Sequence, residues 1–182
     1  MSFFSSRAAA TVLAAVCVAG SLALNTRVKL GNECRQIENG FYETEGNVKT
    51  IDQRLKQRTD AANGLWTIAA KYGAAAASDL STARQVLLDA RDNRDIPAMY
   101  DANEALSTAF AATQTALSGA ALSENDQSAL ADYASAFAGA QKMIDENAYN
   151  GTVRDFTDKT LEAFPASVLA PVFGVEAPKT YN

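Results

Sequence analysis

Apolar residues recur in the first part of the chain at alternating steps of four and three positions. From Leu30 to Tyr72 thirteen positions fall on this pattern, and eleven of them are apolar or aromatic. The eleven are Leu30, Cys34, Ile37, Phe41, Val48, Ile51, Leu55, Ala62, Leu65, Ala69 and Tyr72. A repeat of about 3.5 residues is typical of a helix that buries one face against other helices. The pattern predicts one helix of roughly 60 Å, with a bend or short break near Asn39-Gly40 or Gly46-Asn47 because glycine weakens a helix.

Three further amphipathic segments follow and are joined by short turns. They are predicted at Ala74–Arg91, from Pro97 to Leu117, and from an N-cap at Ser123 to Ile144. The inward positions expected for the last two are Met99, Ala102, Leu106, Phe110, Thr113 and Leu117, then Leu130, Tyr133, Phe137, Ala140 and Ile144. The apolar stripe then resumes at Tyr149 after a step of five, which predicts a distortion between positions 147 and 150.

Pro165 is expected to end the last helix. The apolar side chains after it predict an irregular tail that docks on the bundle, with a turn of helix at Ser167–Ala170. The fold class predicted is all-α, in which an N-terminal membrane helix precedes an antiparallel four-helix bundle with a very long first helix. The corresponding domains are residues 1–24 for the anchor, 25–165 for the bundle and 166–182 for the tail.

The N-terminal segment is uncharged over 17 residues, from Ala8 to Leu24. This length is at the short end for a membrane span. It is either a retained signal-anchor or a secretory signal peptide cleaved after Ala23, because Ser21-Leu22-Ala23 is an acceptable cleavage site. Retention is favoured, since the helical pattern resumes directly after Leu24.

Small residues and flanking charges refine the anchor prediction. Small residues at every fourth position would let membrane helices pack closely, and they are Ala15, Ala19 and Ala23. More basic residues follow the run (Arg27, Lys29 and Arg35) than precede it (Arg7). This asymmetry predicts a single-pass membrane protein whose C-terminal domain is cytoplasmic.

Composition excludes several classes of function. The net charge is −5 and the basic residues form no stripe, so nucleic-acid binding is not expected. The chain contains no histidine, which excludes Ser-His-Asp and Cys-His catalysis and histidine-ligated metals. Cys17 lies in the uncharged run, and Cys34 is expected to be a small core residue. We therefore expect no cofactor, no metal and no catalytic residue.

Arg58 is the candidate of greatest interest because it places a charge on the apolar face. An inward Arg58 could fix the register of the helices or bind an anionic group of a partner. The favoured alternative is that its stem packs while its head reaches solvent or pairs with an acid. The acids considered are Asp101, Glu104 and Asp158.

Other candidate residues have interaction or structural roles. Trp66 is either a core residue or an exposed interface aromatic. Tyr149 and Asn150 are expected to form hydrogen bonds across the bundle rather than a polar site. Phe164-Pro165 and Phe173-Gly174 are interpreted as a helix stop and a docking anchor. Asp52 and Asp60 lie near one face, but no second acidic cluster completes a metal site with them.

Two groups of residues resemble a known family. The first is Ile51-Asp52-x-x-Leu55-Lys56-x-Arg58-x-Asp60, with Leu65 and Tyr72-Gly73. The second is Tyr149-Asn150-x-x-Val153-x-x-Phe156, with Phe164-Pro165, Ala170, Phe173-Gly174 and Tyr181. Their order and spacing, with the N-terminal anchor, resemble LemA proteins over nearly the whole chain. The chain is divergent, because Ala61-Ala62-Asn63-Gly64-Leu65 stands where the family usually has Leu-Ile-Pro-Asn-Leu. The resemblance implies an anchored helical bundle without established catalytic activity.

Three functions follow as hypotheses. The leading one is a membrane-anchored scaffold or adaptor that contacts lipid through its first helix and forms a homo-oligomer or binds an envelope protein. The alternative is an exported bundle, with its signal peptide cleaved, that binds a small ligand. An enzyme that uses only carboxylates, Arg, Lys or Tyr is the least favoured.

Overall fold

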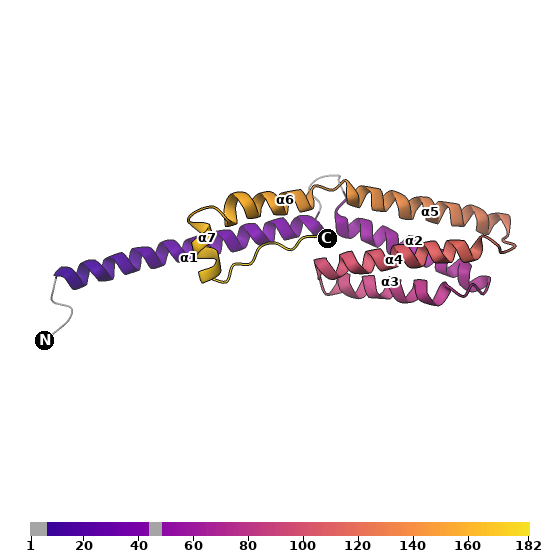
Figure 1. Ribbon diagram of the computed structural model, residues 1–182, viewed down its shortest axis with the longest axis horizontal. Coiled ribbons are helices and arrows are strands. Elements are labelled where there is room, and N and C mark those ends of the chain that lie inside the picture. Colours follow the sequence, from indigo (N-terminus) through magenta and orange to yellow (C-terminus); the bar gives the residue numbers. More distant parts are fainter. Residues whose placement is uncertain (1–6, 44–48) are drawn as a thin grey trace. The chain divides into compact units, whose positions relative to one another are not determined.

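The computed structural model describes residues 7–43 and 49–182, with side chains from residue 20 onward except residue 22. Throughout these residues the chain forms helices, turns and irregular segments, and no strand (Figure 1). The elements are α1 (Arg7–Tyr42), α2 (Ile51–Lys71), α3 (Ala77–Asp92), α4 (Ile96–Leu117), α5 (Glu124–Asp145), α6 (Tyr149–Phe156), the π-helix η2 (Thr157–Leu161) and α7 (Ala166–Val172). The all-helical class predicted from the sequence is confirmed for these residues.

The chain divides into two compact units. Asn39–Asn150 with Lys179–Asn182 form one, which we call the bundle unit, and it contains α2 to α5. The residues up to Glu38 with Gly151–Pro178 form the other, which we call the α1–α7 unit. These units differ from the predicted single bundle over residues 25–165, because the N-terminal part of the predicted first helix packs with the C-terminal segment.

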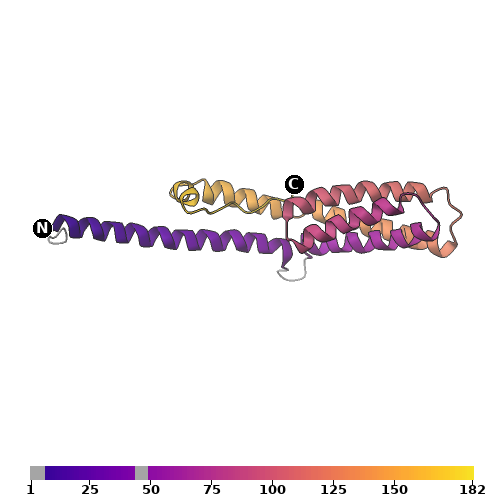
Figure 2. The same cartoon turned by 90° about the horizontal axis from the view of Figure 1, so that it is seen from below.

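Four helices of the bundle unit lie side by side in both views (Figures 1 and 2). The closest pairs are α2 with α5 and α3 with α4. They run antiparallel, because the start of α2 pairs with the end of α3 through Asp52 and Arg91 and the end of α2 pairs with the start of α5 through Lys71 and Asp126. All six inward positions expected for α4 are buried. In α5 the last three of the five are buried and the first two are half-buried.

The predicted first helix is two helices. Since α1 ends at Tyr42 and α2 begins at Ile51, the long first helix is divided in two, as the predicted bend or short break allowed. Thr50 is the N-cap of α2: its hydroxyl accepts from the Gln53 N–H at 3.3 Å, and the Gln53 carboxamide oxygen accepts from the Thr50 N–H at 3.3 Å. This reciprocal capping box satisfies two N–H groups that a helix start leaves open. The break expected at Gly46-Asn47 falls on residues outside those described.

The apolar periodicity still predicted the buried face on both sides of the break. Leu30, Cys34 and Phe41 are buried in α1, and Cys34 is a free thiol as expected for a core residue. Burial raises the pKa of that thiol. In α2 the positions of the pattern are buried from Ile51 to Ala69.

The α1–α7 unit has its own small core. Leu30 of α1 packs with Leu161, Ala166 and Ala170, and Phe156 and Val175 pack partly against them. The turn of helix predicted at Ser167–Ala170 within the tail is part of α7, which is longer and runs from Ala166 to Val172. A distortion predicted between 147 and 150 is confirmed, since α5 ends at Asp145 and α6 begins at Tyr149.

Glycine ends two of these helices. Gly73 and Gly174 have φ values of +65° and +62°, which side chains with a Cβ rarely adopt. After each glycine the next N–H reaches back into the helix, from Ala74 to the Ala69 carbonyl and from Val175 to the Ala170 carbonyl, both at 2.9 Å. These Schellman motifs explain why α2 and α7 stop where they do.

Among the described residues no helix has the length and apolar character needed to cross a membrane. The predicted anchor lies within α1, but most of its side chains are not described, since side chains are described only from residue 20 onward. Ala15 and Ala19 fall in that undescribed part, and Ala23 is half-buried.

Candidate functional site

Arg58 lies in the middle of α2 with only 1% of its surface exposed. The favoured prediction, that its head reaches solvent or pairs with an acid, is wrong. The α2 face that carries Arg58 also carries Leu55, Ala62 and Leu65, all fully buried, so the helix has to turn the guanidinium inward with them.

The guanidinium is held by uncharged side chains of two other helices. One terminal nitrogen, Nη1, donates to Asn103 Oδ1 of α4 and to Gln141 Oε1 of α5. The other, Nη2, donates to Ser107 Oγ at 2.8 Å. Asn103 Nδ2 also donates to Gln141 Oε1 at 3.0 Å, which joins α4 directly to α5. The result is one polar network that connects three helices across the core.

An aromatic stack completes the surroundings of Arg58. Its guanidinium carbon lies 3.9 Å from the centroid of the Phe137 ring, a cation–π distance. Phe137 also stacks on Phe110 with centroids 3.9 Å apart and the planes 8° from parallel. Planar guanidinium and planar rings fit together here in a way that a lysine ammonium could not reproduce.

The charge of Arg58 is compensated indirectly. Burial lowers its pKa to about 10, while Tyr181, Glu104 and Asp145 act in the opposite direction. Asp145 is connected through Gln141, whose Nε2 donates to Asp145 Oδ1 at 2.7 Å. Arg58 stays a cation at neutral pH, and its Nε has no hydrogen-bond partner among the described residues. The network therefore joins α2, α4 and α5 around one enclosed charge.

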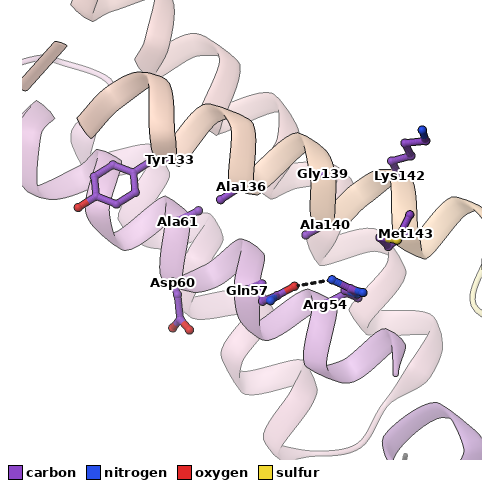
Figure 3. A pocket seen from close by; sticks show the side chains of 10 residues that line it. All are labelled: Arg54, Gln57, Asp60, Ala61, Tyr133, Ala136, Gly139, Ala140, Lys142 and Met143. Atoms are coloured by element: carbon purple, nitrogen blue, oxygen red, sulfur yellow. Dashed lines mark hydrogen bonds between the residues drawn. The ribbon is translucent and has the colours of Figure 1, made fainter. Parts of the chain in front are cut away.

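A groove lies between α2 and α5, on the surface of the bundle unit (Figure 3). Its volume is about 680 Å³, and its floor is made of small residues, Ala61, Ala136, Gly139 and Ala140. The remaining lining residues are Arg54, Gln57, Asp60, Tyr133, Lys142 and Met143. Arg54 donates to Gln57 Oε1 at 3.0 Å within it. The groove thus combines a smooth apolar floor with charges of both signs.

One side of the groove depends on a glycine. A Cβ at Gly64 of α2 would lie 2.3 Å from Cζ of the Tyr133 ring. The ring of Tyr133 therefore lies directly against the α2 backbone, which only glycine allows. Gly64, which weakens the helix by itself, is explained by this contact.

A second polar cluster joins the end of α2 to the start of α5. Asp126 accepts from Lys71 Nζ at 2.7 Å, from Tyr72 Oη at 2.7 Å and from Ser123 Oγ at 2.6 Å. The hydrogen bond from Lys71, followed by those from Ser123 and Tyr72, holds the pKa of Asp126 well below its usual range. As predicted, Ser123 is the N-cap of α5, and it accepts from the Asp126 N–H at 3.3 Å.

Tyr149 and Asn150 bind the C-terminal residues of the chain. Tyr149 Oη donates to the Lys179 carbonyl at 2.6 Å. Asn150 pairs with the Tyr181 backbone at both groups, accepting from its N–H at 2.8 Å and donating to its carbonyl at 2.7 Å. The Tyr181 ring is buried against Phe41 and Tyr100. Both residues form hydrogen bonds, but their partners are in the C-terminal segment and not across the bundle as expected.

Other predicted site residues are dispersed. Asp60 is exposed and pairs with Lys56 at 2.9 Å, and Trp66 is 37% exposed, which makes it a surface aromatic. Phe164 is 85% exposed beside Pro165, whereas Phe173 is half-buried and precedes the glycine that ends α7. Asp52 binds Arg91 with two hydrogen bonds of 2.8 and 3.0 Å.

The hydrogen-bond partners of Arg58 were not predicted from the sequence. Asn103 is fully buried, and Gln141 follows Phe137 by one helical turn. A polar residue beside the apolar stripe of each later helix was the available signal, but nothing local showed that these helices face Arg58.

In the described part of the chain, no group of three or more cysteine, aspartate or glutamate side chains could hold a metal ion. Comparison of the chain with protein-family models, curated proteins and solved structures gave no match. The resemblance to LemA proteins stays a prediction.

Proposed function

We propose that this chain is a non-catalytic helical adaptor of the LemA type, held at a membrane by its N-terminal segment. Its bundle unit would lie on the cytoplasmic side and either self-associate or bind another envelope protein. The groove between α2 and α5 is the surface we assign to that contact, because its small-residue floor would admit a helix of a partner at close range.

One observation supports the membrane location more than any other. The uncharged run from Ala8 to Leu24 lies within α1, which continues without interruption to Tyr42. A single helix would therefore connect a span to the α1–α7 unit. Such continuity suits a retained anchor better than a cleaved leader, which is normally followed by a flexible mature N-terminus.

Fractionation of the native protein tests this proposal. The full chain should stay with membranes after an alkaline carbonate wash, and its mass should be that of all 182 residues. A soluble chain that starts at Leu24 would refute the anchor. Protease treatment of intact cells and of inverted vesicles would then establish on which side the bundle unit lies.

The size of the groove favours a second candidate function. A volume of about 680 Å³ lies within the range of roughly 300–1,000 Å³ that small-molecule sites occupy. An exported bundle with a cleaved signal peptide could bind a small ligand there. Thermal-shift screening of metabolites tests this: a hit whose shift is lost in Ala136→Leu, which would fill the groove from an exposed position, supports the candidate, and retention of the shift contradicts it.

A further inference from the structure

The α1–α7 unit exposes apolar side chains around its short last helix. Phe164 is 85% exposed, Val168 58% and Val172 70%. Val168 and Val172 are one helical turn apart on α7, opposite the buried Ala166 and Ala170. The outward side of α7 is therefore apolar, whereas a helix that faces water normally presents polar residues there.

No charge interrupts this surface. Between Glu162 and Glu176 the thirteen residues Ala163–Val175 are all uncharged. Water is a poor environment for so many neighbouring apolar groups, and such surfaces commonly mark sites of protein or membrane contact. Either a protein or a membrane is therefore expected to cover the outward side of α7.

The position of α7 along α1 identifies the partner. Its buried side packs on Leu30, six residues beyond Leu24, the last residue of the predicted anchor. Six helical residues correspond to about 9 Å, and the headgroup layer on each side of the hydrocarbon core is roughly 5–8 Å thick. Because a helix with its side chains is about 10–12 Å across, α7 packed beside Leu30 lies within reach of that layer.

The basic side chains of α1 also support a position of α7 at the headgroup layer. Arg27 and Lys29 lie between the end of the run and Leu30, and both are exposed. Basic residues at this level would attract anionic headgroups. On the same stretch Leu24 and Val28 are each 59% exposed, as suits a helix that leaves lipid there.

We propose that α7 and its flanks, Ala163–Val175, form a second membrane contact that inserts Phe164, Val168 and Val172 into the headgroup layer beside the anchor. This inference rests on the proposed function, since it requires that Ala8–Leu24 spans the membrane. The contact would hold the α1–α7 unit against the surface, as an interfacial helix does.

Tryptophan fluorescence of the full chain in vesicles tests the inference. Trp66 is the only tryptophan, so a W66F background leaves one reporter at a time. V168W reports on α7, F164W is a second reporter at a still more exposed site, and V16W reports on the anchor. V86W on α3 is the matched control, because Val86 is 50% exposed in the bundle unit. Each is reconstituted into vesicles of phosphatidylcholine and phosphatidylglycerol in equal parts, with and without brominated lipid.

The expected result is a shift of V168W and F164W emission to shorter wavelength, with quenching by bromine several-fold stronger than for V86W. If V16W is quenched while both α7 reporters behave like V86W, the anchor stands and the second contact is refuted. Without quenching of V16W, the anchor and the inference that rests on it both fail. A blue shift of V168W that rises with protein concentration and needs no vesicles would assign the surface to a second copy of the chain instead.

Discussion

At the scale of single residues, Arg58 shows how a buried charge can be kept without a contacting carboxylate. Its guanidinium donates to Asn103, Gln141 and Ser107 and stacks on Phe137. Each partner comes from a different helix than Arg58 itself, so these bonds form only when α2, α4 and α5 adopt one relative register. Buried polar networks of this kind are costly when incomplete and specific when complete.

Replacing Arg58 by methionine is expected to lower the free energy of unfolding by about 2–4 kcal/mol, because the buried Oδ1 of Asn103 and the half-buried Oγ of Ser107 lose their donor. Urea denaturation followed by circular dichroism measures this. The double variant R58M/N103L should recover a large part of the loss, since replacing both partners of a buried pair by apolar groups costs little. A loss below about 0.5 kcal/mol in R58M would mean that the network contributes nothing net.

The lowered pKa of Asp126 predicts that the stability of the fold depends on pH. Because Lys71, Ser123 and Tyr72 hold its folded pKa below the unfolded value, its contribution is present above about pH 4 and is lost as the pH falls below that. The difference in Tm between the wild type and D126N should be constant from about pH 5 to 8 and shrink below about pH 4.

The control is D60N, which removes the exposed pair between Asp60 and Lys56. Exposed pairs of this kind contribute little, so its Tm should stay close to that of the wild type at every pH. A difference between wild type and D126N that persists undiminished at low pH would contradict the role given to Asp126.

At the scale of elements, the sequence pattern predicted most of the helices and their inward faces. Local signals were sufficient where they exist: Pro97 in the first turn of α4 and Ser123 at the start of α5 both act as predicted. The break before α2 also had a local signal, the Thr50-Ile51-Asp52-Gln53 capping box, which the longer apolar repeat obscured. Periodicity alone cannot detect such a break, since the phase of the apolar face is the same on both sides of it.

Contact between α2 and α5 depends on Gly64. Alanine there is expected to lower the free energy of unfolding by about 1–2 kcal/mol, because displacing the Tyr133 ring costs more than the roughly 1 kcal/mol that alanine gains in a helix. In a Y133A background the sign should reverse, and G64A should stabilise. Gly139→Ala on α5 is the matched control, since no atom lies within 4 Å of its Cβ position, and it should stabilise in both backgrounds. The same sign for G64A in both backgrounds would contradict the contact.

The hydrogen bonds of Asn150 are expected to hold the C-terminal residues in place. N150A removes both hydrogen bonds to the Tyr181 backbone, and each such bond is worth about 1 kcal/mol. Hydrogen exchange of the Tyr181 amide should become on the order of tenfold faster or more, while exchange in α3 stays unchanged. N93A, at the exposed end of α3, is the control and should leave Tyr181 as in the wild type. Unchanged exchange in N150A would show that ring packing alone holds this segment.

At the scale of the whole molecule, the proposed location depends on the uncharged run. An aspartate at the centre of a span costs about 2.5–3.5 kcal/mol, so V16D should move a large share of the chain from the membrane to the soluble fraction. Thermal unfolding of the bundle unit should not change, since the run lies outside it. V86D, on the exposed surface of α3, should leave the distribution unaffected. Membrane retention of V16D equal to that of the wild type would contradict the anchor.

The sequence by itself determined the helical class, the buried faces and several helix ends, because these depend on residues within a few turns of one another. The tertiary structure decided which helices and side chains pack against one another, and periodicity carries no information on this. It divided the first predicted helix between two units and turned part of the tail into α7, and it surrounded Arg58 with side chains that lie 45 to 83 positions away in the chain. The physical reason is that a repeat specifies which face of a helix is buried, whereas the partners of that face depend on how all the faces fit together.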